Sequence, residues 1–329
     1  MHGIPGFSII IPVKEVNDYV RETIPYIQAL NTNNWELIIV PNNPEKNEWE
    51  FDQRISQISS GRVGPADKRD LAAKIAKGEI LVFLDDDSFP KSDILAIATK
   101  HFADESISAL GGPAVTPESD SYWQKVSGAV FLSRLTGGNP ERYIPLGDVK
   151  KVDDWPSVNF MVRKSDFTEV GGFDSPYWPG EDTHLCLKLV RNSKNIIYSP
   201  ELIVWHHRRS GLRRHIKQVG AYGLHRGYFA RRLPETSLKV KYFIPSIVLC
   251  LTATSLFSML LPELLRNLVF IGLVIYLSGI IVGSISIAKL TTTRIALGAL
   301  PFIVVTHMSY GFRFLQGFFK IRPLVSKLR

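Results

Sequence analysis

The feature that most constrains the fold is a short apolar run, Ile80–Leu84, that ends in three adjacent carboxylates, Asp85, Asp86 and Asp87. Such a run is typical of a strand buried on both faces, as in a parallel sheet covered by helices. Open parallel sheets bind ligands beyond the carboxyl ends of their strands, so we expect the acids at a ligand site. Three neighbouring negative charges repel one another and favour a compensating cation. Asp85 and Asp87 offer oxygen ligands suited to Mg²⁺ or Mn²⁺; a solvated acidic turn is the alternative.

Strands and helices are expected to alternate around this run. The patterns predict strands at residues 7–13, 35–40, 54–58, 80–84, 107–115, 150–152 and 158–162, and helices at 16–30, 66–77, 92–102, 121–135 and 183–191. This rhythm predicts an α/β fold, with a mixed sheet that is flanked by helices and is largely parallel at its start. A second acidic pair, Glu181 and Asp182, introduces the last of these helices. Acids are favoured at a helix N-terminus, so capping is one interpretation of this pair.

The composition changes after residue 205. Between residues 206 and 241, ten Lys and Arg stand against a single acid, Glu235, with apolar side chains between the charges. This mixture predicts a segment that lies on an anionic membrane surface. A basic nucleic-acid face is disfavoured because long apolar segments follow at once, and we expect no nucleic-acid partner.

Three apolar runs follow, at residues 243–261, 267–288 and 295–318. Each approaches the ~20 residues that cross a hydrocarbon core, so we expect three transmembrane helices. The third run holds Pro301 and His307, whose polar groups must face protein or headgroups. An interfacial or re-entrant third run is the alternative, because three spans would put the basic tail at 320–329 outside, against the charge rule.

The expected organisation is a catalytic domain at 1–205, a basic interfacial segment at 206–241 and a multi-pass membrane domain at 242–329. The basic belt before the first apolar run places the N-terminal domain in the cytoplasm, with the chain in the cytoplasmic membrane. The two cysteines, Cys186 and Cys250, make no disulfide framework, which fits a reducing compartment.

Four blocks, in this order, resemble those of family 2 glycosyltransferases. They are Ser8–Val13, Gly64–Asp70, Phe83–Asp87, and Gly171–Asp174 with Gly180–Asp182. In that family the blocks lead to the nucleotide base, lie beside the nucleotide, form the Asp-x-Asp metal motif and carry the acceptor-side base. The resemblance covers about residues 7–210. It implies a GT-A fold, the Rossmann-like fold of nucleotide-sugar transferases, followed by transmembrane helices.

The resemblance also implies roles for single residues. Those expected to bind the donor nucleotide are Pro12, Val13, Glu15, Lys68, Arg69, Asp85 and Asp86. Those expected to hold Mg²⁺ or Mn²⁺ are Asp85, Asp87 and His206, although a pair such as His206 and His207 is more often structural. Those expected on the acceptor side are Trp178, Gly180 and the catalytic pair, with Asp182 as the base and Glu181 as the second candidate.

The sequence departs from the family pattern in two informative places. Asn42 and Asn43 stand where many relatives place an acid that contacts the base, which puts uracil recognition in doubt. The Gln-x-x-Arg-Trp motif of processive synthases is absent, and Gln218 followed by Tyr222 and Gly223 is only a loose echo of it.

The expected activity is that of a membrane-bound, metal-dependent inverting glycosyltransferase. It would move a sugar from a nucleoside-diphosphate sugar, UDP- or GDP-linked, to a lipid-linked or polyprenyl acceptor in glycan or cell-envelope biosynthesis. A metal ion would stabilise the leaving diphosphate, and a carboxylate would take the acceptor proton. A processive polysaccharide synthase is the alternative enzyme, and a catalytically dead membrane scaffold is the alternative outside enzymes.

Overall fold

The computed structural model describes residues 6–43, 46 and 48–324, which form two compact units. The first unit contains the described residues up to Pro117 together with Ile144–His207, and the second contains Glu118–Tyr143 with Arg208–Leu324. The second unit is therefore built from two separate segments of the chain. The composition change at residue 205 predicts the second segment but not the first, Glu118–Tyr143. The last part of the basic tail, residues 325–329, lies outside the described residues.

The first unit is built on an eight-stranded sheet, β3-β2-β1-β4-β9-β6-β10-β8, and a three-stranded sheet, β5-β11-β7. The strands are β1 (Phe7–Pro12), β2 (Trp35–Val40), β3 (Ile55–Gln57), β4 (Ile80–Leu84), β5 (Ser88–Pro90), β6 (Ile107–Gly111), β7 (Ala114–Val115), β8 (Lys150–Val152), β9 (Asn159–Arg163), β10 (Asn195–Tyr198) and β11 (Val204–His206). The first four strands of the large sheet pair in parallel, as expected. Strand β9 runs antiparallel between β4 and β6, which makes the sheet mixed.

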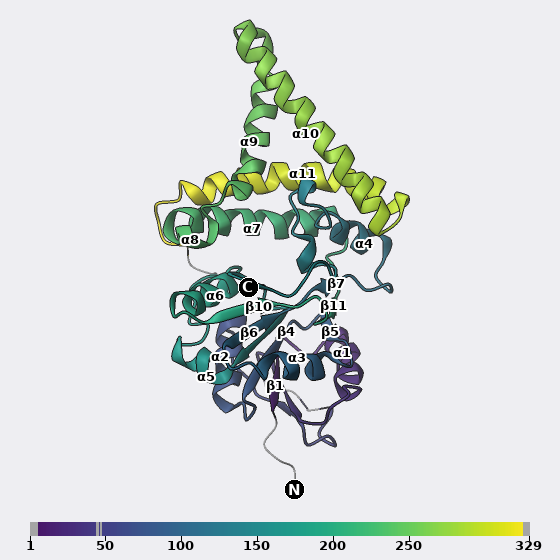
Figure 1. Ribbon diagram of the computed structural model, residues 1–329, viewed down its shortest axis with the longest axis vertical. Helices are drawn as coiled ribbons and strands as arrows, with labels where there is room; N and C mark the ends of the chain where they lie inside the picture. The colour runs from purple at the N-terminus through teal and green to yellow at the C-terminus, as the bar shows by residue number, and fades with distance from the viewer. Residues whose placement is uncertain (1–5, 44–45, 47, 325–329) are drawn as a thin grey trace. The chain divides into compact units, whose positions relative to one another are not determined.

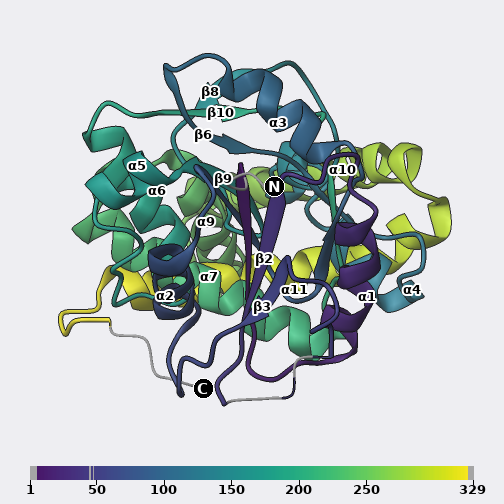
Figure 2. The same ribbon diagram turned by 90° about the horizontal axis from the view of Figure 1, so that it is seen from below.

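Helices cover both faces of the large sheet. They are α1 (Asp18–Gln28), α2 (Pro65–Ile75), α3 (Ile94–Phe102), α5 (Lys164–Glu169) and α6 (Glu181–Arg191). Residues of α1 and α3 share one buried cluster with Ile80, Val82 and Leu84, whereas residues of α2, α5 and α6 share the other with Leu81 and Phe83. Figure 2 shows α2, α5 and α6 on one side of the strands and α1 on the other. Strand β4 is thus buried on both faces, which confirms the expectation from its continuous apolar sequence.

The second unit is helical. It consists of α4 (Tyr122–Ala129), η1 (Arg134–Thr136), η2 (Pro140–Arg142), α7 (Leu212–Arg232), α8 (Pro234–Ser237), α9 (Val240–Ser255), η3 (Ser258–Leu260), α10 (Glu263–Leu290) and α11 (Thr293–Phe318). Helices α7 and α11 lie side by side, and α9 and α10 leave them as a hairpin that ends at η3 (Figure 1).

Among the described helices, α10 and α11 are the two that are long and apolar enough to cross a bilayer. The first expected span forms α9, which has 16 residues and is followed by the 3₁₀ turn η3. This helix is shorter than the ~20 residues that a perpendicular span requires.

Candidate active site

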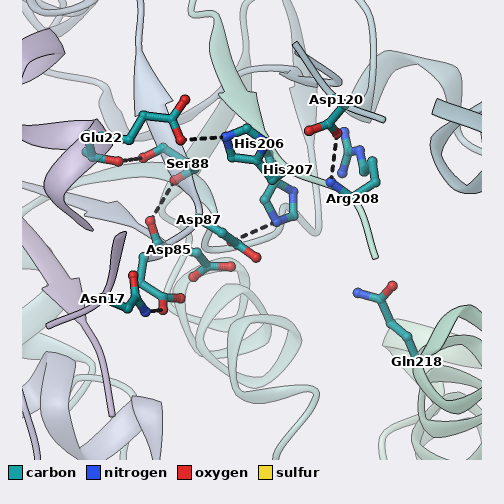
Figure 3. A network of polar contacts seen from close by, with 12 residues as sticks. Asn17, Glu22, Asp85, Asp87, Ser88, Asp120, His206, His207, Arg208 and Gln218 are labelled. Carbon is teal, nitrogen blue, oxygen red and sulfur yellow. Dashed lines mark hydrogen bonds and ion pairs between the residues drawn. The ribbon is translucent and has the colours of Figure 1, made fainter. Parts of the chain in front are cut away.

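The acids that follow β4 lie beside a histidine from a distant strand. The Nε2 atom of His206 lies 3.1 Å from Oδ1 of Asp87, and one potential ligand atom from each of Asp85, Asp87 and His206 lies within 4.8 Å of the others. Figure 3 shows the Asp87–His206 pair with Asp85 close to it. The antiparallel register of β11 on β5 places His206 opposite Ser88, one residue after the acids. Two carboxylates and an imidazole are a ligand set that a divalent cation such as Mn²⁺ accepts.

Of the two adjacent histidines, only His206 joins this cluster. Successive side chains of a strand point to opposite faces, so the residue after the end of β11 turns away. The Nε2 atom of His207 lies 3.0 Å from Oε2 of Glu22, and its ring contacts Tyr19, both on α1. His207 therefore connects the small sheet to α1. The sequence alone could not show which of the two adjacent histidines has this structural role.

Arg69 connects the two acidic groups that the sequence separates. Its guanidinium donates to Oδ1 of Asp85 at 2.7 Å and to Oε1 of Glu181 at 3.1 Å, and only 2% of the residue is exposed. Burial, followed by the charge of neighbouring Asp182, raises the pKa of Glu181 to about 7, against the opposing effect of Arg69. The acids after β4 and the acids at the start of α6 thus belong to one site in the first unit.

The N-terminus of α6 holds the second pair of acids in place. The helix begins directly after Gly180, whose φ of 114° is a conformation that favours glycine. The first residue of the helix, Glu181, is buried, whereas Asp182 is partly exposed and its Oδ1 accepts a hydrogen bond from the backbone N–H of Thr183 at 2.7 Å. Trp178, two residues before Gly180, is partly buried. Asp182 is therefore the more accessible acid of the pair.

Asp70 has a structural role that the sequence did not reveal. Its carboxylate accepts hydrogen bonds from the backbone N–H groups of Phe173 at 2.8 Å and Asp174 at 2.9 Å. A Cβ on Gly172 would lie 2.6 Å from Oδ1 of Asp70, so only glycine lets the turn approach this closely. The helix that carries Arg69 and the turn that leads to α6 are therefore held together by one carboxylate. Its burial raises the pKa of Asp70 above its usual range.

The ammonium group of Lys68, in α2, lies at the C-terminal ends of β1 and β2. Its ammonium donates to the carbonyl oxygens of Val13 and Val40 and, at 2.6 Å, to Oδ1 of Asn42. An ammonium has three protons, so these contacts use its full donor capacity. The expected contact of Lys68 with phosphates stays a prediction, and the geometry gives it a role in fixing the strand ends.

A cavity of about 360 Å³ lies beyond those strand ends. It is lined by Lys14, Asn42, Asn43 and Arg62, two cations and two amides. Among the other residues expected to bind the donor, Pro12 ends β1, Glu15 is exposed, and Asp86 accepts a hydrogen bond from Nδ2 of Asn17 at 2.7 Å. The donor roles of Pro12, Val13, Glu15 and Asp86 stay predictions.

Comparison with known proteins decides the family. Residues 80–315, which include β4, Asp85 to Asp87, Glu181, His206 and most of the second unit, match the model for glycosyl transferase family group 2. The chain belongs to this family. The match covers well over half of the sequence, and its range includes nearly all of the apolar C-terminal helices as well as the acids.

The curated relatives are named as glycosyltransferases. The pre-mycofactocin glycosyltransferase of Mycobacterium tuberculosis is 29% identical over 172 residues, which are 52% of this chain and 36% of that protein. The match thus spans about a third of that relative. The dolichyl N-acetyl-alpha-D-glucosaminyl phosphate 3-beta-D-2,3-diacetamido-2,3-dideoxy-beta-D-glucuronosyltransferase of Methanococcus voltae is 22% identical over 249 residues, 73% of this chain and 71% of that protein.

A solved structure supports the fold. The mannosyltransferase PcManGT from Pyrobaculum calidifontis, determined in complex with GDP-Man and Mn²⁺, superposes with a TM-score of 0.53 and 17% sequence identity, over 97% of this chain and 88% of that one. The expected GT-A fold with apolar C-terminal helices is therefore confirmed.

Proposed function

We propose that this family member is a membrane-bound, metal-dependent inverting glycosyltransferase that moves a sugar from a nucleoside-diphosphate sugar to a lipid-linked acceptor. The observation that carries the proposal is the pair of hydrogen bonds by which Arg69 joins Asp85 to Glu181. A donor-side carboxylate and an acceptor-side carboxylate face one buried guanidinium. Inverting transfer needs groups that act on opposite sides of one anomeric carbon, and Arg69 brings the carboxylates assigned to the two sides into one site.

The donor side is assigned to Asp85, Asp87 and His206. Their donor atoms are close enough to hold one divalent cation, and Mg²⁺ or Mn²⁺ would neutralise the charge that develops on the leaving diphosphate. Asp87 is buried and paired with His206, so it is fixed before a ligand arrives. Asp85 is held by Arg69 through Oδ1, which leaves its second oxygen for the cation.

The nucleotide base is assigned to the cavity beyond β1 and β2. Asn42 and Asn43 can each donate and accept hydrogen bonds, so their amides can read the edge of a base. The donor is a UDP- or GDP-linked sugar. The two cations that line the cavity, Lys14 and Arg62, favour a ligand with negative charge nearby.

The base that deprotonates the acceptor is assigned to Asp182. A general base must reach the acceptor hydroxyl or phosphate, and the partly exposed Asp182 meets that condition better than Glu181, which is buried against Arg69. Glu181 then acts on Asp182 through its charge and its position.

The acceptor is assigned to lipids for two reasons. Two described helices are long and apolar enough to cross a bilayer. The Methanococcus voltae relative carries a dolichyl phosphate sugar in its name. A lipid-linked acceptor, such as a polyprenyl phosphate or a polyprenyl-linked sugar, fits both observations.

Transfer of label from radioactive nucleotide sugars in purified membranes tests this function. We expect label in an organic-extractable lipid, lost with EDTA and restored by Mn²⁺, and lost in Asp182→Asn while donor binding is retained. Label in a polymer would assign the chain to a processive synthase. Absence of transfer from every UDP- and GDP-sugar, in a preparation that binds neither donor nor metal, would indicate a scaffold instead.

A further inference from the structure

The middle of α11 is surrounded by protein. His215 of α7 lies 2.7 Å from Oγ1 of Thr306 through Nε2 and 2.8 Å from Oγ of Ser127 in α4 through Nδ1. The next residue of α11, His307, lies 2.9 Å from the carbonyl oxygen of Thr136 in η1 through Nε2. The polar groups in the middle of α11 are therefore paired within the protein, Thr306 with α7 and His307 with η1 and with Tyr276 of α10. All of these elements belong to the second unit.

Helix α7 runs along α11 at backbone contact distance. A Cβ on Gly223 would lie 2.6 Å from the carbonyl oxygen of Tyr310, and one on Gly227 would lie 2.0 Å from that of Phe314. Residue numbers rise together along the two helices. His215, near the start of α7, lies opposite Thr306, and Arg232, the last residue of α7, donates a hydrogen bond to the carbonyl oxygen of Ile321 at 3.2 Å. The two helices are consequently parallel and in contact over most of the length of α7.

Helix α7 does not fit in hydrocarbon. Its exposed cations are Arg213, Arg214, Lys217, Arg231 and Arg232. Each charge at the centre of a bilayer costs about 2.5–3.5 kcal/mol even on the most lenient scale. His215, near the start of α7, lies opposite Thr306 in the middle of α11. If α11 crossed the bilayer, the neighbouring Arg213, Arg214 and Lys217 would therefore lie near the bilayer centre. The length and apolar composition of α11 therefore do not make it a span.

One face of α11 nevertheless suits lipid. Leu297, Val304 and Phe312 are 61%, 38% and 54% exposed, and Phe319, directly after the helix, is 69% exposed. Spacings of seven and eight residues keep these side chains within one face of an α-helix. The opposite face is the one that packs on α4 and α7. An apolar stripe on a helix backed by a cationic helix is the pattern of a surface that lies at a membrane interface.

The α9–α10 hairpin has different properties. In the last part of α10 one face is buried, where a Cβ on Gly283 would lie 2.8 Å from Thr136, while Ile281, Val282 and Ile285 on the other face are more than half exposed. In the stretch 263–279 every apolar side chain except that of Val269 is exposed or half-exposed. Those 17 residues extend about 25 Å at ~1.5 Å per residue, and the 16 residues of α9 extend about 24 Å. Two arms of equal length, comparable with the ~30 Å hydrocarbon core, project from the α7–α11 layer.

We propose that the α9–α10 hairpin alone enters the bilayer, and that α11 lies in the headgroup layer with its apolar stripe toward the lipid. The end of α11 then stays on the same side of the membrane as α7 and the first unit. This resolves the conflict with the charge rule, because the basic residues that follow α11 remain on the side of the basic helix. The inference rests on membrane association and is independent of sugar transfer.

Nitroxide labels at exposed positions test this topology in the full chain, reconstituted into vesicles that contain anionic lipid. With Cys250→Ser as background and buried Cys186 retained, the labels replace Leu297, Val304 and Phe312 in α11. The matched set in α10 replaces Leu264, Ile271 and Leu277, which are similarly exposed. The ratio of the nitroxide's collision rates with oxygen and with a water-soluble nickel chelate reports the depth of each label in the bilayer. We expect one shallow depth for the three α11 labels and a depth gradient along the α10 labels.

Side-specific labelling gives an independent measurement. Arg322→Cys, which reports the end of α11, and Lys74→Cys, in the first unit, are treated with an impermeant maleimide in sealed vesicles. We expect both to react from the same side. The proposal is overturned if Arg322→Cys reacts only from the opposite side, if the three α11 labels show a maximum of depth at Val304, or if all three are fully exposed to water. None of these readouts depends on catalysis, so an inactive enzyme would leave the topology decided.

Discussion

Replacing Glu181 with glutamine tests whether the buried carboxylate couples the two halves of the site. Burial and Asp182 raise the pKa of Glu181 from 4.5 to about 7 in the folded protein. At ~1.4 kcal/mol per pKa unit, ionisation in the folded state costs about 3–4 kcal/mol more than in the unfolded chain. The side chain is only 7% exposed, so solvent screens this cost little.

The sign of the pH dependence follows from linkage. Because the folded pKa lies above the unfolded one, the folded state holds the proton more strongly between pH 4.5 and 7. The wild-type protein therefore loses about 3–4 kcal/mol of stability as the pH rises through that window, and the loss is complete above pH 7. Glutamine keeps an acceptor for Arg69 and does not titrate. The free energy of unfolding of the variant, relative to that of the wild type, should therefore increase by about 2–3 kcal/mol from pH 5 to pH 8.

Thermal unfolding in detergent with EDTA, at pH 5 and pH 8, measures this difference. For a unit of this size ~1 kcal/mol shifts Tm by about 2–4 °C, so the gap between variant and wild type should widen by about 4–12 °C. Infrared titration provides a second readout, because the band of a protonated carboxyl group near pH 6 should disappear in the variant. Wild-type and variant curves that stay parallel from pH 5 to pH 8 would refute the electrostatic reasoning.

Three further substitutions test single contacts. His206→Ala should weaken Mn²⁺ binding by at least about tenfold in calorimetric titration, whereas the neighbouring His207→Ala should leave it unchanged; equal losses would contradict the assignment of the two rings. Gly227→Ala should destabilise the second unit by about 1–3 kcal/mol in thermal unfolding, because its Cβ would lie 2.0 Å from a backbone oxygen. The control Gly279→Ala, with nothing within 4 Å, should be neutral or stabilising by up to about 1 kcal/mol. Asp70→Ala should cost about 2–4 kcal/mol, since two backbone N–H groups lose their acceptor; an unchanged Tm would show that water replaces it.

The sequence predicted the first acidic cluster because its position follows from local pattern alone. An apolar run of strand length must be buried, and the residues after it must emerge at the sheet edge, so Asp85 and Asp87 could be placed without any tertiary information. His206 could not be distinguished from His207 in this way, because the choice depends on the register of β11 against β5. Arg69 was predicted as a donor contact, but its bridge to Glu181, 112 residues away, depends on how two helices pack against the sheet.

The same reasoning explains why the placement of the C-terminal helices could not be predicted from the sequence alone. Apolar length is a necessary property of a membrane span, and both α10 and α11 have it. The two differ in what covers them: 17% of the most apolar window is buried in α10, and 39% in α11. Residues that pair with the middle of α11 come from α7 and η1, about 90 and 170 positions earlier in the chain. A hydropathy pattern describes one segment at a time, whereas the choice between a span and an interfacial helix depends on the charge carried by its neighbour. Here that neighbour is the cationic α7, and our proposal of an interfacial α11 rests on its charge.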